Sequence, residues 1–93
     1  MKIGFIGTGK ITSSIIYGIF KSKLKNLKIS VSPRNRSIAN KLSKKFRSVE
    51  IRKDNQEVID RSDIIFLAVT PNVGLKILDK LRFTSSKKII SFI

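Results

Sequence analysis

The sequence has no cysteine and no histidine among its 93 residues. These absences exclude disulfide bonds, thiolate chemistry and a serine–histidine catalytic pair within the chain, and they remove the usual ligands of a zinc site. No apolar run approaches the roughly 18 residues that a membrane-spanning helix needs. Residues 1–7 have glycines too early and too short an apolar stretch for a signal peptide. We therefore expect a cytoplasmic protein without a metal site.

Acidic residues are scarce as well. The chain has 6 Asp+Glu against 20 Lys+Arg, a formal net charge of +14, and its first acid is Glu50. Residues 21–53 hold twelve bases and that single acid. Such a charge attracts polyanions, so a nucleic-acid-binding module is one interpretation and a lysine-rich compositional bias is another. Tyr17, Phe20 and Phe46 fall at apolar helical positions and do not alternate with the bases, which disfavours nucleic acid.

Strand-like and helix-like segments alternate along the whole chain. A length of 93 residues with 41% hydrophobic side chains suits one small domain, or a piece of one. The alternation predicts an α/β fold, a Rossmann-like doubly wound parallel sheet in a single truncated domain over residues 1–93. The apolar run 64–69 predicts a central strand covered on both faces. The expected strands are 2–6, 28–31, 49–51, 64–69 and 87–93, and the expected helices are 10–23, 37–47, a short one after Asp54, and one after Pro71.

The segment Gly7-Thr8-Gly9-Lys10-Ile11-Thr12 is a glycine turn placed directly after a strand and at the start of a helix. In that context the pattern is typical of dinucleotide binding. Gly7 permits the tight turn, Gly9 allows the backbone to approach a pyrophosphate, and free amides at the helix start favour the anion. Thr12 departs from the pattern, and its branched side chain is expected to push the helix outward and lower cofactor affinity. A glycine turn without a ligand remains the alternative.

The end of the second strand indicates which dinucleotide is bound. Enzymes that select NAD place an acid there for the ribose 2′-hydroxyl, whereas this sequence has Ser32-Pro33-Arg34-Asn35-Arg36 without a carboxylate. A charge-assisted bond contributes about 1.5–3 kcal/mol, so one arginine implies a preference for NADP of roughly ten- to a hundredfold. We therefore expect NADP(H), bound chiefly through Arg34. Arg36, and to a lesser degree Arg34, can also be interpreted as solvated loop charges.

Two further candidate segments follow strands, at the sheet edge where open parallel sheets bind ligands. The backbone of Val69 and Thr70 would pass beside the ribose and nicotinamide, unless the segment is only a strand ended by Pro71. Asn55 is a candidate for the adenosine side. Asp54 is interpreted as a helix cap in a capping box with Glu57.

Four segments in this order resemble the N-terminal domain of pyrroline-5-carboxylate reductase: residues 2–11, 31–35, 54–58 and 63–71. The resemblance spans nearly all of the chain. It implies reduction of 1-pyrroline-5-carboxylate to L-proline in proline biosynthesis, with hydride passing from NAD(P)H to a C=N bond. Carried over position by position, the implied cofactor-binding residues are Ile6, Gly7, Thr8, Gly9, Lys10, Ile11, Ser32, Arg34, Asn55, Val69 and Thr70.

The sequence departs from this family in two residues and one domain. Thr12 stands where the family has a small residue, and Thr70 replaces a lysine common before Pro71. The family's C-terminal helical domain, which provides dimerisation, the substrate site and a hydroxyl donor, is not within residues 1–93. We therefore expect no catalytic residue here, weak NADP(H) binding and little or no turnover by this chain alone. Self-association into a homo-oligomer is expected through Ile89, Ile90, Phe92 and Ile93.

Three other functions remain open at this point. Deazaflavin-dependent NADP reductases and beta-hydroxyacid dehydrogenases share the first and last of the four segments, so another Rossmann-type NADP-dependent reductase is possible. The chain could be a non-catalytic NADPH-binding sensor. It could also be the basic nucleic-acid-binding module considered above. Stronger stabilisation by NADPH than by NADH would favour nucleotide binding.

Overall fold

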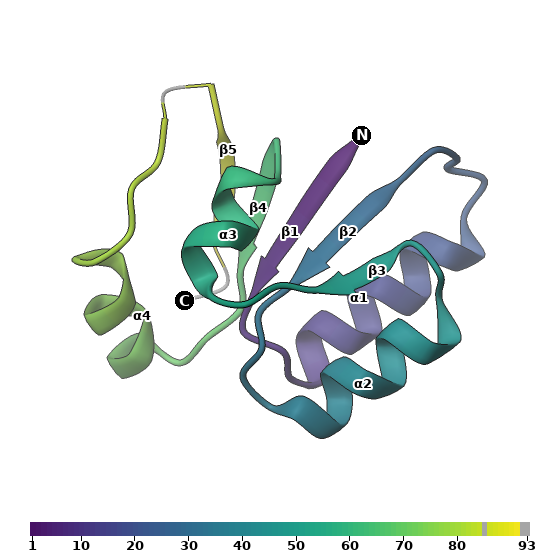
Figure 1. Ribbon diagram of the computed structural model, residues 1–93, viewed down its shortest axis with the longest axis horizontal. Coiled ribbons are helices and arrows are strands. Elements are labelled where there is room, and N and C mark those ends of the chain that lie inside the picture. Colours follow the sequence, from purple (N-terminus) through teal and green to yellow (C-terminus); the bar gives the residue numbers. More distant parts are fainter. Residues whose placement is uncertain (85, 92–93) are drawn as a thin grey trace.

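The computed structural model describes residues 1–84 and 86–91, and it contains one parallel five-stranded sheet (Figure 1). The strand order is β3-β2-β1-β4-β5, so the direction of winding reverses between β1 and β4. This is the doubly wound arrangement, and the predicted fold class is confirmed. The strands are β1 (Lys2–Ile6), β2 (Lys28–Val31), β3 (Val49–Ile51), β4 (Ile64–Leu67) and β5 (Lys88–Ser91).

In the described residues four helices connect the strands, close to the predicted positions. They are α1 (Lys10–Lys21), α2 (Arg36–Lys45), α3 (Asn55–Asp60) and α4 (Pro71–Leu78). The first helix ends two residues earlier than predicted because the backbone of Ser22 is extended and its N–H closes the last turn on Gly18 and Ile19. The second begins at Arg36, one residue before the predicted start, because Asn35, in a left-handed conformation with φ of 60°, takes the N-cap position.

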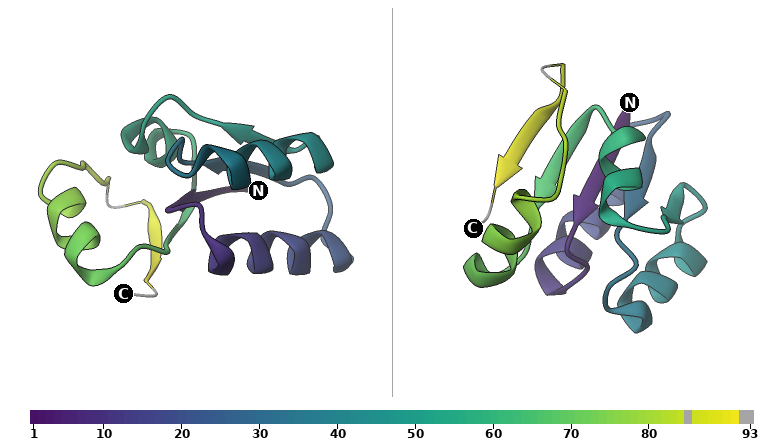
Figure 2. Two further views of the ribbon diagram at one scale, coloured as in Figure 1. Left: turned by 90° about the horizontal axis from the view of Figure 1, so that it is seen from below. Right: turned by 60° about the vertical axis from the view of Figure 1, so that its left-hand side comes forward.

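The two faces of the sheet bury separate apolar clusters. Side chains alternate between the faces, so Phe5 points into one cluster and Ile6 into the other. The first cluster joins β1, β2 and β3 to α1 and α2, and the second joins β1 and β4 to α3 and α4. Figure 2 shows α1 and α3 on opposite sides of β1.

The central strand β4 is covered less completely than its sequence predicts. Ile65 and Leu67 are buried under α3 and α4, whereas Ile64 and Phe66 are only half-buried. Phe66 packs against the cluster of α1 and α2, with its ring stacked on that of Phe5 at 4.9 Å between centroids, but it stays half-buried because these helices cover mainly β1, β2 and β3.

Helix α3 packs directly on β1 because Gly4 has no side chain. A Cβ at Gly4 would lie 2.3 Å from the Ser62 hydroxyl and 2.8 Å from a methyl of Val58. The predicted cap of α3 is confirmed, since the Asp54 carboxylate accepts the Glu57 N–H at 2.8 Å. The Glu57 carboxylate in turn accepts the N–H of Lys53 at 3.2 Å, one residue before the capping position.

The β5 edge is the most exposed part of the described sheet. Ile89 and Ile90 are 45% and 43% exposed. Phe92 and Ile93, also predicted to belong to this surface, lie outside the described residues, and self-association stays a prediction. No helix in residues 1–84 and 86–91 has the length and hydropathy needed to cross a bilayer.

Candidate functional site

The predicted site residues converge where β1, β2 and β4 end. The carboxyl ends of these strands and the first turns of α1 and α2 lie together at the lower centre of Figure 1. The glycine turn occupies the junction between β1 and α1, as the sequence predicts. A switch point in the strand order lies beside it, between β1 and β4.

Gly7 is required by both backbone conformation and space. Its φ is +96°, a value that residues with side chains rarely adopt. A Cβ at this position would lie 2.3 Å from the carbonyl oxygen of Ala68 and 2.6 Å from a methyl of Val69. The first glycine therefore lets the end of β4 lie directly against the turn.

Gly9 faces open space. It is the N-cap of α1, it supplies no side-chain cap, and the first turn of the helix contains no acid. Apart from Gly9 itself and its two chain neighbours, no atom of the described residues lies within 4 Å of the place where a Cβ of Gly9 would be. The first-turn amides, which include those of Lys10 and Ile11, have no carbonyl partner within a helix. The junction therefore fits a pyrophosphate group, which needs both a backbone approach and free N–H donors.

Ser32 connects the turn after β2 to the glycine turn. Its hydroxyl accepts the N–H of Gly7 at 3.0 Å and lies 3.1 Å from the Thr8 hydroxyl, which also donates to the Ser32 carbonyl at 2.9 Å. Ser32 is 1% exposed and Thr8 3% exposed. Their hydroxyls are thus engaged inside the protein, where they hold the two loops together. The sequence points to a small polar residue at this strand end, but it does not reveal this bond across 25 residues.

Thr12 fits the junction better than its sequence predicts. Its side chain is fully buried and its hydroxyl donates to the carbonyl of Gly7 at 2.5 Å. The helix still begins at Lys10, and its first hydrogen bond, from the Ser13 N–H to the Gly9 carbonyl, is 3.0 Å long. The expected displacement of the helix is therefore not needed to accommodate the threonine, because the hydroxyl satisfies a backbone acceptor. An effect of Thr12 on cofactor affinity stays a prediction.

The remaining predicted residues line the same edge with different exposure. Arg34 is exposed in the turn after β2, and among the described residues neither it nor Arg36 forms an ion pair. Val69 is half-buried against Gly7, and Thr70 is the exposed N-cap of α4, without a side-chain cap. Asn55 is the half-buried first residue of α3, which follows the carboxyl end of β3.

The charges at this edge suit an anionic ligand. Neither α1 nor α2 has an acid in its first turn, and Lys10, Arg34 and Arg36 are exposed around the two helix starts. Within the described part of the chain no three Asp or Glu residues gather as a metal site would require. The arrangement can hold phosphate groups on backbone amides and arginines.

Comparison with known proteins assigns the chain to a family. The family model described as "NADP oxidoreductase coenzyme F420-dependent" matches residues 2–93. The chain belongs to this family. Within the family, the predicted resemblance to the N-terminal domain of pyrroline-5-carboxylate reductase is confirmed.

Curated proteins and a solved structure support this assignment. The pyrroline-5-carboxylate reductase of Methanosarcina acetivorans is 33% identical over 98 residues, covering 97% of this chain and 34% of the relative. The Arabidopsis thaliana enzyme is 32% identical over 93 residues, covering 92% and 31%. The 1-pyrroline-5-carboxylate reductase structure from Streptococcus pyogenes superposes with a TM-score of 0.77 at 30% identity, covering 98% of this chain and 33% of that one. The chain therefore spans about a third of the length of these relatives.

Proposed function

We propose that residues 1–93 form the NADP(H)-binding domain of a cytoplasmic pyrroline-5-carboxylate reductase. The main observation in support is the open space at the Cβ position of Gly9. This residue is the N-cap of α1, a helix start without a side-chain cap and without an acid in its first turn. A pyrophosphate would bind to the first-turn amides of α1. The family and its curated relatives support a nicotinamide cofactor.

The side chains around the turn would have distinct roles in holding the cofactor. Ser32 would position the glycine turn through its bond to the Gly7 amide. Arg34 would bind the 2′-phosphate, because no carboxylate competes for it in residues 32–36. Asn55 would contact the adenosine side, and the backbone of Val69 and Thr70 the ribose and nicotinamide. When bound, the reduced nicotinamide would supply the hydride that reduces the imine carbon.

We propose further that the substrate site belongs to a C-terminal domain outside residues 1–93. Catalysis depends on positioning the substrate and on excluding water from it. This chain alone would therefore bind NADP(H) weakly and turn over little substrate. Pyrroline-5-carboxylate-dependent oxidation of NADPH by the purified 93-residue chain would contradict this part of the proposal.

Thermal unfolding with NADPH, NADH and a duplex oligonucleotide, each at two salt concentrations, tests the proposed cofactor. We expect NADPH to raise the unfolding temperature more than NADH does. Stabilisation by the oligonucleotide alone, lost steeply on addition of salt, would instead indicate a nucleic-acid-binding module. Equal shifts with NADPH and NADH would contradict the proposed selectivity.

The description of the matching family favours a second candidate, an NADP reductase that uses a deazaflavin. This candidate shares the cofactor site and differs in the second substrate. It is distinguished by assaying a longer protein that contains this domain. Oxidation of NADPH with pyrroline-5-carboxylate supports the first function, and oxidation with the oxidised deazaflavin supports the second.

A further inference from the structure

A second concentration of positive charge lies on the sheet, away from the glycine turn. Among the described residues, the apolar cluster on the sheet face that carries α3 and α4 includes residues of β1 and β4 but none of β2 or β3. On β2 and β3 the side chains directed to this face are polar: Lys28, Ser30 and Glu50. Over β2 and β3 this face of the sheet therefore carries polar and charged side chains instead of an apolar cluster.

Lys28 and Glu50 border a hollow of about 140 Å³. Its lining contains four cationic side chains and one carboxylate: Lys2, Lys28, Arg52, Arg61 and Glu50. A water molecule takes up about 30 Å³ of liquid, so the hollow has room for a small oxyanion with water around it. Lys2 begins β1, Lys28 begins β2, Arg52 directly follows β3, and Arg61 is the C-cap of α3.

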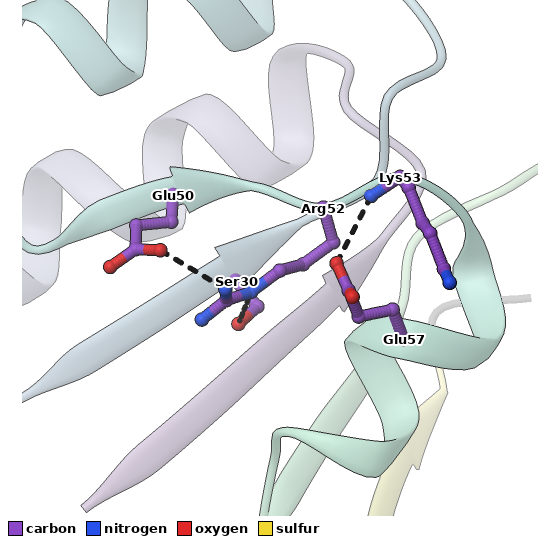
Figure 3. A network of polar contacts seen from close by, with 5 residues as sticks. All are labelled: Ser30, Glu50, Arg52, Lys53 and Glu57. Carbon is purple, nitrogen blue, oxygen red and sulfur yellow. Dashed lines mark hydrogen bonds and ion pairs between the residues drawn. The ribbon is translucent and has the colours of Figure 1, made fainter.

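Arg52 is fixed within this hollow. Its Nε donates to the buried Ser30 hydroxyl at 2.9 Å and its Nη1 donates to the Glu50 carboxylate at 3.0 Å (Figure 3). The Arg52 side chain is 16% exposed, against 64% for Glu50. Glu50, the single acid of the hollow, is thereby paired, and the guanidinium keeps further N–H groups for another acceptor. Among the residues that the structure describes, no acid forms an ion pair with Lys2, Lys28 or Arg61.

Lys2 and Lys28 face each other across β1 and β2. They are register partners in the parallel pair, so their backbones lie about 4.8 Å apart and their side chains project from the same face. Like charges on neighbouring strands destabilise a sheet. Among the described residues neither lysine forms an ion pair. An anion between them would remove this repulsion.

We propose that this hollow is a second anion site, which takes a compact oxyanion carrying two or more negative charges, of the phosphate or pyrophosphate type. Arg52 supplies a fixed donor, and Lys2, Lys28 and Arg61 supply charge around it. The site is distinct from the glycine turn, because Lys2 and Lys28 begin their strands whereas the turn follows the end of β1. At about 3.3 Å per residue, the length of β1 separates the two.

Titration of the 93-residue chain with inorganic pyrophosphate, followed by amide resonances, tests the proposal because it reports each site separately. We expect saturable shifts at Lys2, Lys28 and Glu50. The double variant Lys28→Gln, Arg61→Gln should bind at this site at least about tenfold more weakly. The matched control is Lys41→Gln, Lys44→Gln, which removes the same charge from exposed positions of α2 and should change affinity less than about twofold.

Three results would overturn the second site. Shifts confined to residues 7–12 would mean that pyrophosphate binds the glycine turn alone. An equal loss of affinity in both double variants would mean that only the net charge matters. Absence of saturation would mean that the anion is merely concentrated around a basic protein. The amide spectrum of each variant without ligand verifies that it is folded.

Discussion

The hydroxyl of Ser32 accepts the backbone N–H of Gly7 at 3.0 Å, which joins two turns that lie 25 residues apart. The bond is buried, and the Thr8 hydroxyl lies beside it and donates to the Ser32 carbonyl, so the Ser32 and Thr8 side chains together hold the two turns against each other. The buried hydroxyls of Ser32 and Thr8 therefore shape the candidate site from inside the protein, whereas other, exposed residues of the site can contact a ligand.

Ser32→Ala should destabilise the protein and weaken NADPH binding together. The substitution leaves the buried N–H of Gly7 without its acceptor, which costs about 1–3 kcal/mol of unfolding free energy. Urea denaturation and calorimetric titration with NADPH measure the two effects. Ser37→Ala, at an exposed position of α2, is the control and should change neither. Normal stability with weaker binding would show that Ser32 acts on the ligand directly.

Alanine substitutions at the two glycines of the turn should have opposite consequences. Gly7→Ala should lower the unfolding free energy by about 1–3 kcal/mol or more, because it combines a strained φ with contacts to Ala68 and Val69. Gly9→Ala should leave stability nearly unchanged, since nothing lies near its Cβ, but should weaken NADPH binding about tenfold. Thermal unfolding with and without NADPH distinguishes them. Unchanged NADPH affinity in Gly9→Ala would argue against a pyrophosphate at this turn.

Arg34→Gln should reduce affinity for NADPH by roughly ten- to a hundredfold and leave affinity for NADH unchanged, because it removes a partner of the 2′-phosphate only. Calorimetric titrations with both nucleotides provide the comparison. Arg36→Gln, two residues further along the same exposed segment, is the matched control for net charge. Parallel losses for NADPH and NADH would remove Arg34 from the proposed phosphate site.

Thr12→Val should destabilise the start of α1. Valine has nearly the same shape but cannot donate to the Gly7 carbonyl, so a buried acceptor loses its partner at a cost of about 1–3 kcal/mol. Urea denaturation measures this cost, and Ser14→Ala, at an exposed position of the same helix, is the control. If Thr12→Val is as stable as the parent chain, the hydroxyl has no structural role.

Ile89→Lys should reduce self-association without unfolding the domain. Ile89 is 45% exposed on β5, one of the two edge strands of the described sheet, and a charge there discourages pairing between edges. Sedimentation at increasing protein concentration compares the variant with the parent chain. A parent chain that stays monomeric at high concentration would contradict the predicted association.

The sequence predicted the order of the elements because most of its local signals agreed with the final fold. The spacing of apolar residues predicted β2 and β3 at their observed positions. The cap at Asp54 was predictable because it involves only Glu57, three residues further along the chain. The starting residue of α2 was wrong because nothing in the local pattern shows that Asn35 would adopt a left-handed conformation. The internal role of Ser32 and the pairing of Arg52 with Ser30 depend on which strands become neighbours, and spacing along the chain does not encode that.

The buried bond between Ser32 and Gly7 also couples the two turns mechanically. Neither turn can open without breaking the same hydroxyl contact, so a ligand that touches only one of them would still restrict the other. Slower hydrogen exchange at the Gly7 amide would then accompany the binding of a fragment as small as adenosine 2′,5′-bisphosphate.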